Sequence, residues 1–311
     1  PENIITSTEE LEGFLQRVQY ENISLVIYQS VTFADAEFIQ KTIEILNVPV
    51  IVWSVREPSV GGRLRLNSLT GGNSVSHFLR SANHPYRFIY GNVTEENLQK
   101  RLKILLDVHR VIQRLRSLKI GIVGEYPPGF FFSDTKEHLL HEKIGPKIEK
   151  FDLHKAFEES KQIPESQYKD MIERAEKQVI GIKKSDETVK RFAQFSTYVE
   201  KEIISRGISA LAIRCWPDFF NELGAAACST LSQFTEEGIV SSCESDIHGS
   251  ISMFILRELA GSPPYLGDMV HIDEENNSAV FWHCGAGAYS LAHPASGAKA
   301  GVHPNRKLGL A

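Results

Sequence analysis

The sequence predicts an α/β protein with two Rossmann-like parallel-sheet domains, followed by the start of a mainly β C-terminal domain. Three observations support this fold class. Amphipathic helical segments alternate with short β-branched runs in the first third of the chain, and the same alternation restarts near residue 119. After residue 268 it changes to short strand-like pieces separated by a polar turn. Helices that alternate with strands are typical of parallel sheets with helices on their faces.

The first domain is expected over residues 1–117. Its expected elements are, in order, a helix at 9–18, the strand ISLVIY, a helix at 34–46, and the strands VPVIVW and YRFIY. A long helix over 94–115 should end the domain, because apolar residues such as Leu98 and Leu102 recur there at helical spacing.

The second domain is expected over residues 118–268. It opens with the strand KIGIVG, and charged, helical sequence runs over 165–206. The apolar run ISALAIRCW predicts a buried strand, and a helix is expected over 218–235. The pieces MVHID and SAVFW, joined by the turn EENN, indicate an antiparallel hairpin that begins a third domain over 269–311. Because the chain stops soon after this hairpin, we expect it to be part of a longer one.

The composition excludes several classes of function. The 34 basic and 39 acidic residues give a net charge of −5, so the chain lacks the positive field that holds nucleic acid or an anionic membrane. No run approaches the roughly 20 apolar residues of a membrane helix, and the first residues lack the pattern of a secretory signal. We expect a cytoplasmic protein that binds neither nucleic acid nor membranes.

The cysteines lie far apart in the sequence, and no two form a C-x-x-C pair. The chain has four, Cys215, Cys228, Cys243 and Cys284. This spacing encodes neither a zinc knuckle nor a disulfide framework. We expect the thiols to be reduced, and most of them to be buried as small apolar residues.

A candidate binding loop, WSVREPSVGGRLRLNSLTGGN, follows an expected strand over residues 53–73. Its paired glycines allow close backbone approach. Arg63, Arg65, Asn67 and Asn73 offer hydrogen-bond donors for hydroxyls or for an anionic group. The alternative is a long solvated loop whose arginines form salt bridges.

Two further segments lie at the carboxyl ends of expected strands, where open α/β sheets place their ligands. In IRCWPDF, Trp216 is a candidate for stacking on a sugar face, and the alternative is simple packing between domains. In SSCESDIHG, Asp246 suffices to cap the helix that follows. Glu244 comes before that cap and is therefore free to act as a metal ligand or a base.

The expected hairpin places Asp268 and His283 on neighbouring strands. Together with Glu244 they form a hard, mixed oxygen and nitrogen ligand set that suits Mn²⁺, Mg²⁺ or Co²⁺. Acids and a histidine at such spacing also occur by chance, and His283 beside Trp282 has the alternative interpretation of a core histidine.

Taken together, these segments resemble the L-fucose isomerase and L-arabinose isomerase superfamily. The resemblance implies that Glu244, and Asp268 in GSPPYLGDMV, bind the metal, and that His283 joins them as in the arabinose branch. It also implies that the 53–73 loop, with Trp53 and Asn67 as its best matches, reaches a neighbouring subunit's site. Homo-oligomers with shared active sites follow from this. Family members also have a C-terminal domain that supplies a further metal histidine, for which His293 and His303 are poor substitutes.

The activity that the resemblance implies is a divalent-metal-dependent aldose–ketose isomerisation of a monosaccharide through an enediolate. Glu244 and Asp268 would be the catalytic acids. Arg63 and Arg65 exceed what a neutral sugar requires, and they suggest an anionic hexose, such as a sulfonated or phosphorylated one. Two alternatives remain, a non-catalytic sugar-binding protein with paired α/β domains and a metal-dependent aldolase.

Overall fold

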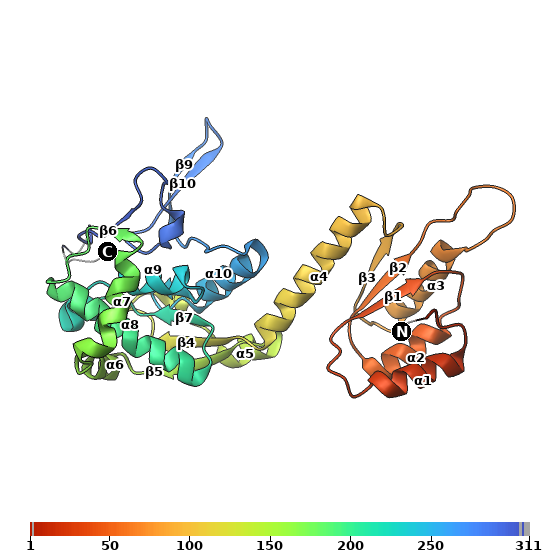
Figure 1. Cartoon of the computed structure of the whole chain (residues 1–311), viewed down its shortest axis with the longest axis horizontal. Coiled ribbons are helices and arrows are strands. Elements are labelled where there is room, and N and C mark those ends of the chain that lie inside the picture. Colours follow the sequence, from red (N-terminus) through yellow and green to blue (C-terminus); the bar gives the residue numbers. More distant parts are fainter. Residues whose placement is uncertain (2, 305–306, 308–311) are drawn as a thin grey trace. The chain divides into compact units, whose positions relative to one another are not determined.

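The structure is a computed structural model that describes residue 1, residues 3–304 and residue 307. The chain divides into two compact units, Pro1–Gln113 and Arg114–Ala311 (Figure 1). Both units contain parallel sheets flanked by helices, so the predicted α/β class is confirmed. In the part of the chain that the structure describes, no helix is long and apolar enough to cross a membrane.

The first unit has a parallel sheet with helices on both faces. Its elements are α1 (Thr8–Val18), β1 (Val26–Ser30), α2 (Glu37–Leu46), β2 (Val50–Ser54), α3 (Ser68–Ser81), β3 (Tyr86–Tyr90) and α4 (Glu96–Arg116). The strands lie in the order β1-β2-β3. Ile39 and Val75 pack on one face of the sheet, and Leu98 of α4 packs on the other. The boundary between the units falls within α4, close to the domain end predicted at residue 117.

Helix α3 corrects the expectation of one continuous loop over residues 53–73. The first two of these residues belong to β2 and the last ones form the start of α3, so the loop covers only 55–67. A helix is required here because two neighbouring parallel strands need a crossover connection. Gly71 and Gly72 allow this helix to approach the sheet rather than a ligand, since a Cβ on Gly72 would lie 2.0 Å from the Ser54 Oγ.

The second unit is larger. Its elements are β4 (Lys119–Val123), the 3₁₀ helix η1 (Phe131–Ser133), α5 (Glu137–Lys143), β5 (Lys147–Phe151), α6 (Leu153–Lys161), α7 (Glu165–Glu176), β6 (Val179–Ile180), α8 (Glu187–Arg206), β7 (Ala210–Ile213), the π-helix η2 (Phe219–Leu223), α9 (Cys228–Glu236), β8 (Val240–Cys243), α10 (Ile247–Ala260), β9 (Asp268–Asp273), β10 (Ser278–Trp282), the 3₁₀ helix η3 (Tyr289–Leu291) and β11 (Ala298–Lys299). The main sheet has the parallel order β5-β4-β7-β8, and β6 pairs with β11. The helix predicted over 218–235 is divided at Gly224, whose φ of 79° ends η2.

The core of the second unit supports the carboxyl ends of its strands. All four residues of β7 are buried. Phe157, Phe195 and Phe219 form a cluster of rings with centroids 4.9 to 5.8 Å apart. Such close-packed aromatic contacts resist displacement. The loops after β7 and β8 therefore start from a rigid base.

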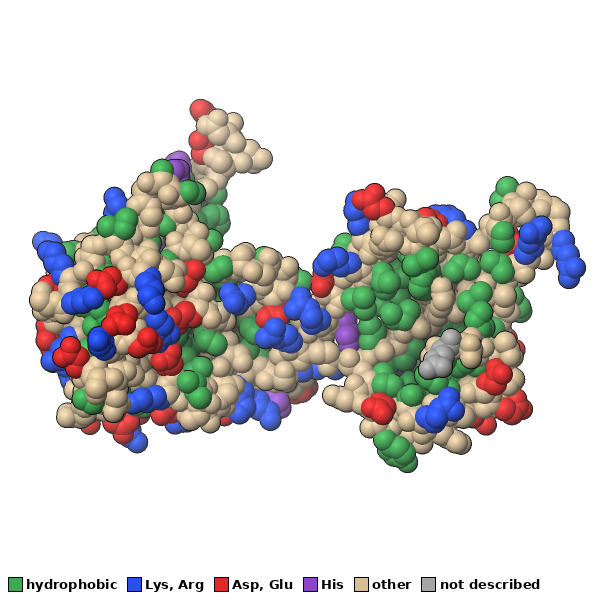
Figure 2. All heavy atoms as spheres, in the orientation of Figure 1, with side chains coloured by type: hydrophobic (Ala, Val, Ile, Leu, Met, Phe, Trp, Pro, Cys, Tyr) green, Lys and Arg blue, Asp and Glu red, His purple; other side chains and the backbone are tan. Residues whose placement is uncertain are grey.

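The predicted hairpin is confirmed as the antiparallel pair β9 and β10, which projects from the second unit (Figure 1). Most of its apolar side chains are exposed, namely Met269, Val270, Ile272, Val280, Phe281 and Trp282. Hydrophobic side chains lie at its base and acidic ones at its tip (Figure 2). Contiguous exposed apolar surface of this kind typically marks an interaction site. The described residues after 268 cluster with the second unit, and a separate C-terminal domain stays a prediction.

Substitution of Gly72 tests the close packing of α3 on the sheet. We expect Gly72→Ala to destabilise the first unit by about 1–3 kcal/mol, because the new Cβ would overlap the side chains of Ser54 and Phe88. The matched control is Gly13→Ala on α1, where nothing lies within 4 Å and alanine should stabilise the helix by about 0.5–1 kcal/mol. Urea unfolding of both variants measures the difference. Equal effects of the two substitutions would contradict this packing.

Candidate active site

The turn after β8 places Glu244 at the carboxyl ends of β4, β7 and β8. Glu244 and Ser245 both have positive φ angles, 59° and 54°, a conformation that costs about 1 kcal/mol or more for a residue with a side chain. The Ser245 backbone N–H donates to Ile213 O at the end of β7, over 3.2 Å. Its hydroxyl donates to Gly124 O just after β4, over 3.0 Å. These bonds fix the direction in which Glu244 leaves the sheet.

Asp246 has the capping role that the sequence predicts for it. Its Oδ1 accepts a hydrogen bond from the Gly249 N–H over 2.8 Å and so caps α10. Because Asp246 already satisfies the start of this helix, Glu244 has no capping function.

Glu244 and Asp268 line one cavity of about 190 Å³, and His283 and Trp216 line it with them. In the described residues, no hydrogen bond or ion pair engages either carboxylate. Burial, and then the negative charge of Asp268, raise the pKa of Glu244 to about 7. Two acids that share a cavity whose described lining has no lysine or arginine are a costly arrangement, which a bound cation would relieve.

Both ring nitrogens of His283 already have partners. Nδ1 accepts backbone N–H bonds from Ala286 over 3.0 Å and from Gly285 over 3.3 Å. Nε2 lies 3.2 Å from the Cys243 Sγ. With Nδ1 as an acceptor, the neutral ring carries its proton on Nε2. As a metal ligand, His283 would have to give up the Cys243 contact, and this role stays a prediction.

The four cysteines also line this cavity, which their sequence spacing did not reveal. All four are free thiols, as expected. The contact with Cys228 is the main reason that the pKa of the Cys284 thiol lies well below its ordinary value. The cysteines meet because each one lies at the end of a strand or the start of a helix. Only the strand order, which the spacing in the sequence does not give, could have predicted that the four thiols share one cavity.

Arg63 and Arg65 are exposed in the 55–67 loop of the first unit, and within the described residues neither guanidinium forms an ion pair. The predicted alternative of salt-bridged arginines therefore does not hold for these two. Glu57, which sequence reasoning missed, organises the same loop. Its carboxylate accepts backbone N–H bonds from Arg65 and Asn67 over 2.6 and 2.8 Å, which lower the pKa of Glu57.

The other predicted binding residues of the first unit are partly engaged. The Trp53 indole N–H donates to Gly91 O over 2.8 Å, so its polar group is bound within the unit. Asn67 has a left-handed backbone at the start of α3, and its side-chain oxygen accepts a bond from Thr70. Asn73 is exposed on α3. A role in binding stays a prediction for all three.

The donor set fits a hard divalent cation. Glu244 and Asp268 supply carboxylate oxygens and His283 an imidazole nitrogen, and the described cavity lining contains no lysine or arginine to compete with a cation. Oxygen-rich sets of this kind suit Mn²⁺, Mg²⁺ or Co²⁺. The ligand atoms of Glu244, Asp268 and His283 do not all lie within 4.8 Å of one another, so binding would draw them together.

Comparison with known proteins identifies the family. The chain is 64% identical over 312 residues to a protein named sulfoquinovose isomerase from Priestia megaterium. The match covers 100% of this chain and 70% of that protein. It is 58% identical to a sulfoquinovose isomerase of Alkalicoccus urumqiensis and 35% identical to one of Clostridium sp. (strain MSTE9).

The chain belongs to the sulfoquinovose isomerase family. The expected relationship to sugar isomerases is therefore confirmed. The L-fucose and L-arabinose isomerase superfamily stays a prediction, and no protein-family model matches the chain.

The raised pKa of Glu244 predicts an unusual effect on stability. The pKa of Glu244 is about 7 in the folded chain, and its ordinary value is 4.5. The contribution of Glu244 to the free energy of unfolding is therefore complete below pH 4.5 and is lost as the pH rises through 7. Metal-free Glu244→Gln should therefore be more stable than the parent at pH 8. Because the carboxyl is only half-buried, we expect a gain on the order of 1 kcal/mol.

Urea unfolding in chelator at about pH 5 and pH 8 measures this gain. Glu158→Gln, at an exposed position on α6, is the matched control. The idea is wrong if Glu244→Gln and Glu158→Gln change stability equally at both pH values.

Proposed function

We propose that this chain is an aldose–ketose isomerase of a sulfonated hexose, sulfoquinovose, and that Glu244 and Asp268, with His283, hold a divalent cation such as Mn²⁺. The observation that carries the proposal is the pair of carboxylates in one cavity whose described lining contains no lysine or arginine. The chain that contains it is 64% identical to proteins named for this activity.

The reaction moves a proton between C2 and C1 of the sugar while negative charge builds on two neighbouring oxygens. A bound divalent cation supplies Lewis-acid stabilisation of that charge, worth several kcal/mol. We assign the transfer of this proton to Glu244, whose carboxylate lines the cavity. Asp268, the first residue of β9, lines the same cavity and can accept and return the proton of a sugar hydroxyl from a different side.

The sulfonate needs a positive partner that the cavity does not supply. Its described lining has two acids, histidines, cysteines and aromatic rings but no lysine or arginine. At about 190 Å³ it is also smaller than the roughly 300 Å³ typical of the smallest ligand sites. We assign sulfonate binding to Arg63 and Arg65 on the 55–67 loop, whose guanidinium groups can bind an anionic oxygen pair.

We further propose a homo-oligomer in which this loop completes a neighbouring subunit's site. The exposed apolar hairpin β9–β10 supports such assembly, because it leaves side chains such as Phe281 and Trp282 in need of cover. A cytoplasmic location fits the thiols, since closely spaced cysteines stay reduced in a reducing compartment.

A non-catalytic sugar-binding protein is the weaker alternative. Such proteins have no need of two carboxylates in the binding cavity, one of which, Glu244, has a raised pKa, and the relatives of this chain are named isomerases. A metal-dependent aldolase is distinguished by its products, because it would cleave the sugar rather than convert aldose to ketose.

Removal of one catalytic carboxylate tests the proposal. We expect Glu244→Gln to lower kcat for conversion of sulfoquinovose to its ketose by about 10³-fold or more, because the variant cannot carry the proton. Asp246→Asn is the matched control, since asparagine also caps helices and Asp246 does not line the cavity. Ketose formation is followed by NMR, and circular dichroism checks the fold.

The same assay tests the metal. Chelator should abolish turnover of the parent and Mn²⁺ should restore it. Turnover by Glu244→Gln at the parent rate, or full activity of the parent in excess chelator, would each overturn the assignment of these carboxylates.

Loss of an arginine tests how the sulfonate is bound. We expect Arg63→Gln or Arg65→Gln to raise KM for sulfoquinovose by about 10-fold or more, the value of a charge-assisted hydrogen bond. Any slow turnover of a neutral hexose should be unchanged. Arg80→Gln, at an exposed arginine of the same unit, is the control. An equal loss for both sugars would show that these arginines do not recognise the sulfonate.

A further inference from the structure

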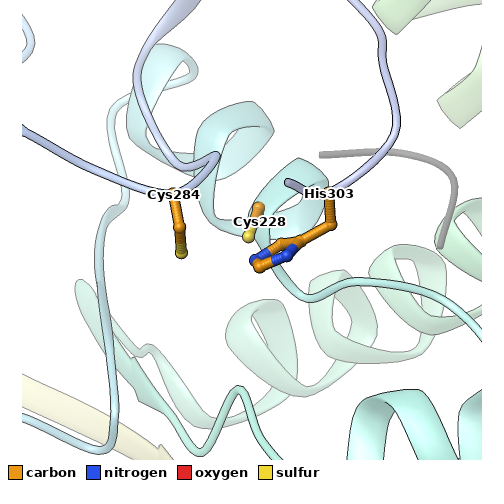
Figure 3. Close-up of side chains that lie close together, drawn as sticks. All are labelled: Cys228, Cys284 and His303. Atoms are coloured by element: carbon orange, nitrogen blue, oxygen red, sulfur yellow. The ribbon is translucent and has the colours of Figure 1, made fainter. Parts of the chain in front are cut away.

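A second cluster of metal-ligating side chains lines the same cavity as the carboxylate pair and shares no residue with it. The Sγ atoms of Cys228 and Cys284 and a ring nitrogen of His303 all lie within 4.8 Å of one another. Figure 3 shows the three side chains converging from separate segments of the chain. Cys228 begins α9, Cys284 follows β10, and His303 follows β11.

The chemistry of this cluster differs from that of the candidate active site. Thiolates and imidazole are the ligands that select Zn²⁺ and other soft ions, whereas carboxylates favour Mn²⁺ or Mg²⁺. With Zn–S distances of about 2.3 Å and tetrahedral angles, two sulfur ligands lie about 3.8 Å apart. Because these atoms lie no more than 4.8 Å apart, a contraction of at most about 1 Å reaches this geometry.

Burial makes the cluster more than a surface coincidence. Cys228 and His303 are each only 4% exposed, and the His303 ring is held edge-on by Phe220 at 5.2 Å. Cys284 is partly exposed and leaves an approach from the cavity. We propose that Cys228, Cys284 and His303 form a binding site for one Zn²⁺-class ion, with the fourth position open to the cavity.

Two other clusters are weaker candidates. In the cluster of Cys215, Cys243 and Glu244, the sulfur of Cys243 already contacts the His283 ring, and Glu244 belongs to the candidate active site. In the cluster around His154, the side chains are largely exposed, and Asp218 is bound by Arg214 over 2.6 Å. Neither offers two thiols and an imidazole.

An ion in this site would join three segments that are distant in the sequence. It would link His303 after β11 and Cys284 after β10 to Cys228 at the start of α9. An ion that binds only the folded chain adds to its stability by mass action. The site is therefore expected to stabilise the second unit independently of any catalytic role.

Cd²⁺ is a direct probe, because bound thiolates give it a charge-transfer absorption. The reduced, metal-free full chain should bind one Cd²⁺ with this absorption, and Zn²⁺ should displace it and raise the melting temperature. Excess Mn²⁺ should not displace it. We expect Cys284→Ser, and separately His303→Asn, to weaken binding by about 100-fold or more.

Two control variants locate the ion. Cys215→Ser removes a thiol of the same cavity outside the trio, and Glu244→Gln removes a carboxylate of the candidate active site. Both should keep the absorption and the affinity, and circular dichroism confirms the fold of every variant. The proposal is overturned if the parent shows no stoichiometric charge-transfer absorption, or if Cys215→Ser loses it while Cys284→Ser keeps it. Glu244→Gln also separates this site from the isomerase proposal, because it would remove turnover and leave Cd²⁺ binding intact.

Discussion

The candidate site depends on one strained turn at the end of β8. Two consecutive residues with side chains, Glu244 and Ser245, adopt a left-handed backbone that each would avoid in isolation. Ser245 stabilises this conformation by bonding to the ends of β4 and β7. The free energy stored in the turn is balanced by the packed sheet beneath it, and the result is a carboxylate aimed into a cavity. Strain of this kind is typical of functional sites.

The sequence predicted the parts of the fold and site that depend on local patterns. The hairpin at 268–282 and the cap formed by Asp246 follow from short-range chemistry, and both are confirmed. Helix α3 was missed because its glycines suit a loop, and only the crossover between β2 and β3 requires a helix there. The cysteine cluster was missed because strand order, which no local spacing records, brings its members together.

The charges around the cavity of the second unit bear on the proposed function. The cavity of the second unit is acidic and rich in sulfur, and its described lining lacks a basic side chain. An anionic sugar would be repelled by such a surface unless cations offset the carboxylates. In the proposed function, a divalent ion at Glu244 and Asp268 would do this at the reacting carbons, and Arg63 and Arg65 of a neighbouring subunit would do it at the sulfonate. The proposed substrate would thus be bound by positive charge at both of its ends.

The hairpin that carries Asp268 has little core of its own. Its apolar side chains are mostly exposed, and an isolated two-stranded hairpin is at best marginally stable in water. Asp268 and His283 can therefore hold fixed positions only if neighbouring groups restrain the segments around them. Within this chain the restraint comes from the bonds that His283 makes to Cys243 and to the turn at Ala286. Burial of the hairpin against a partner would add the rest, so assembly and catalysis would depend on the same surface.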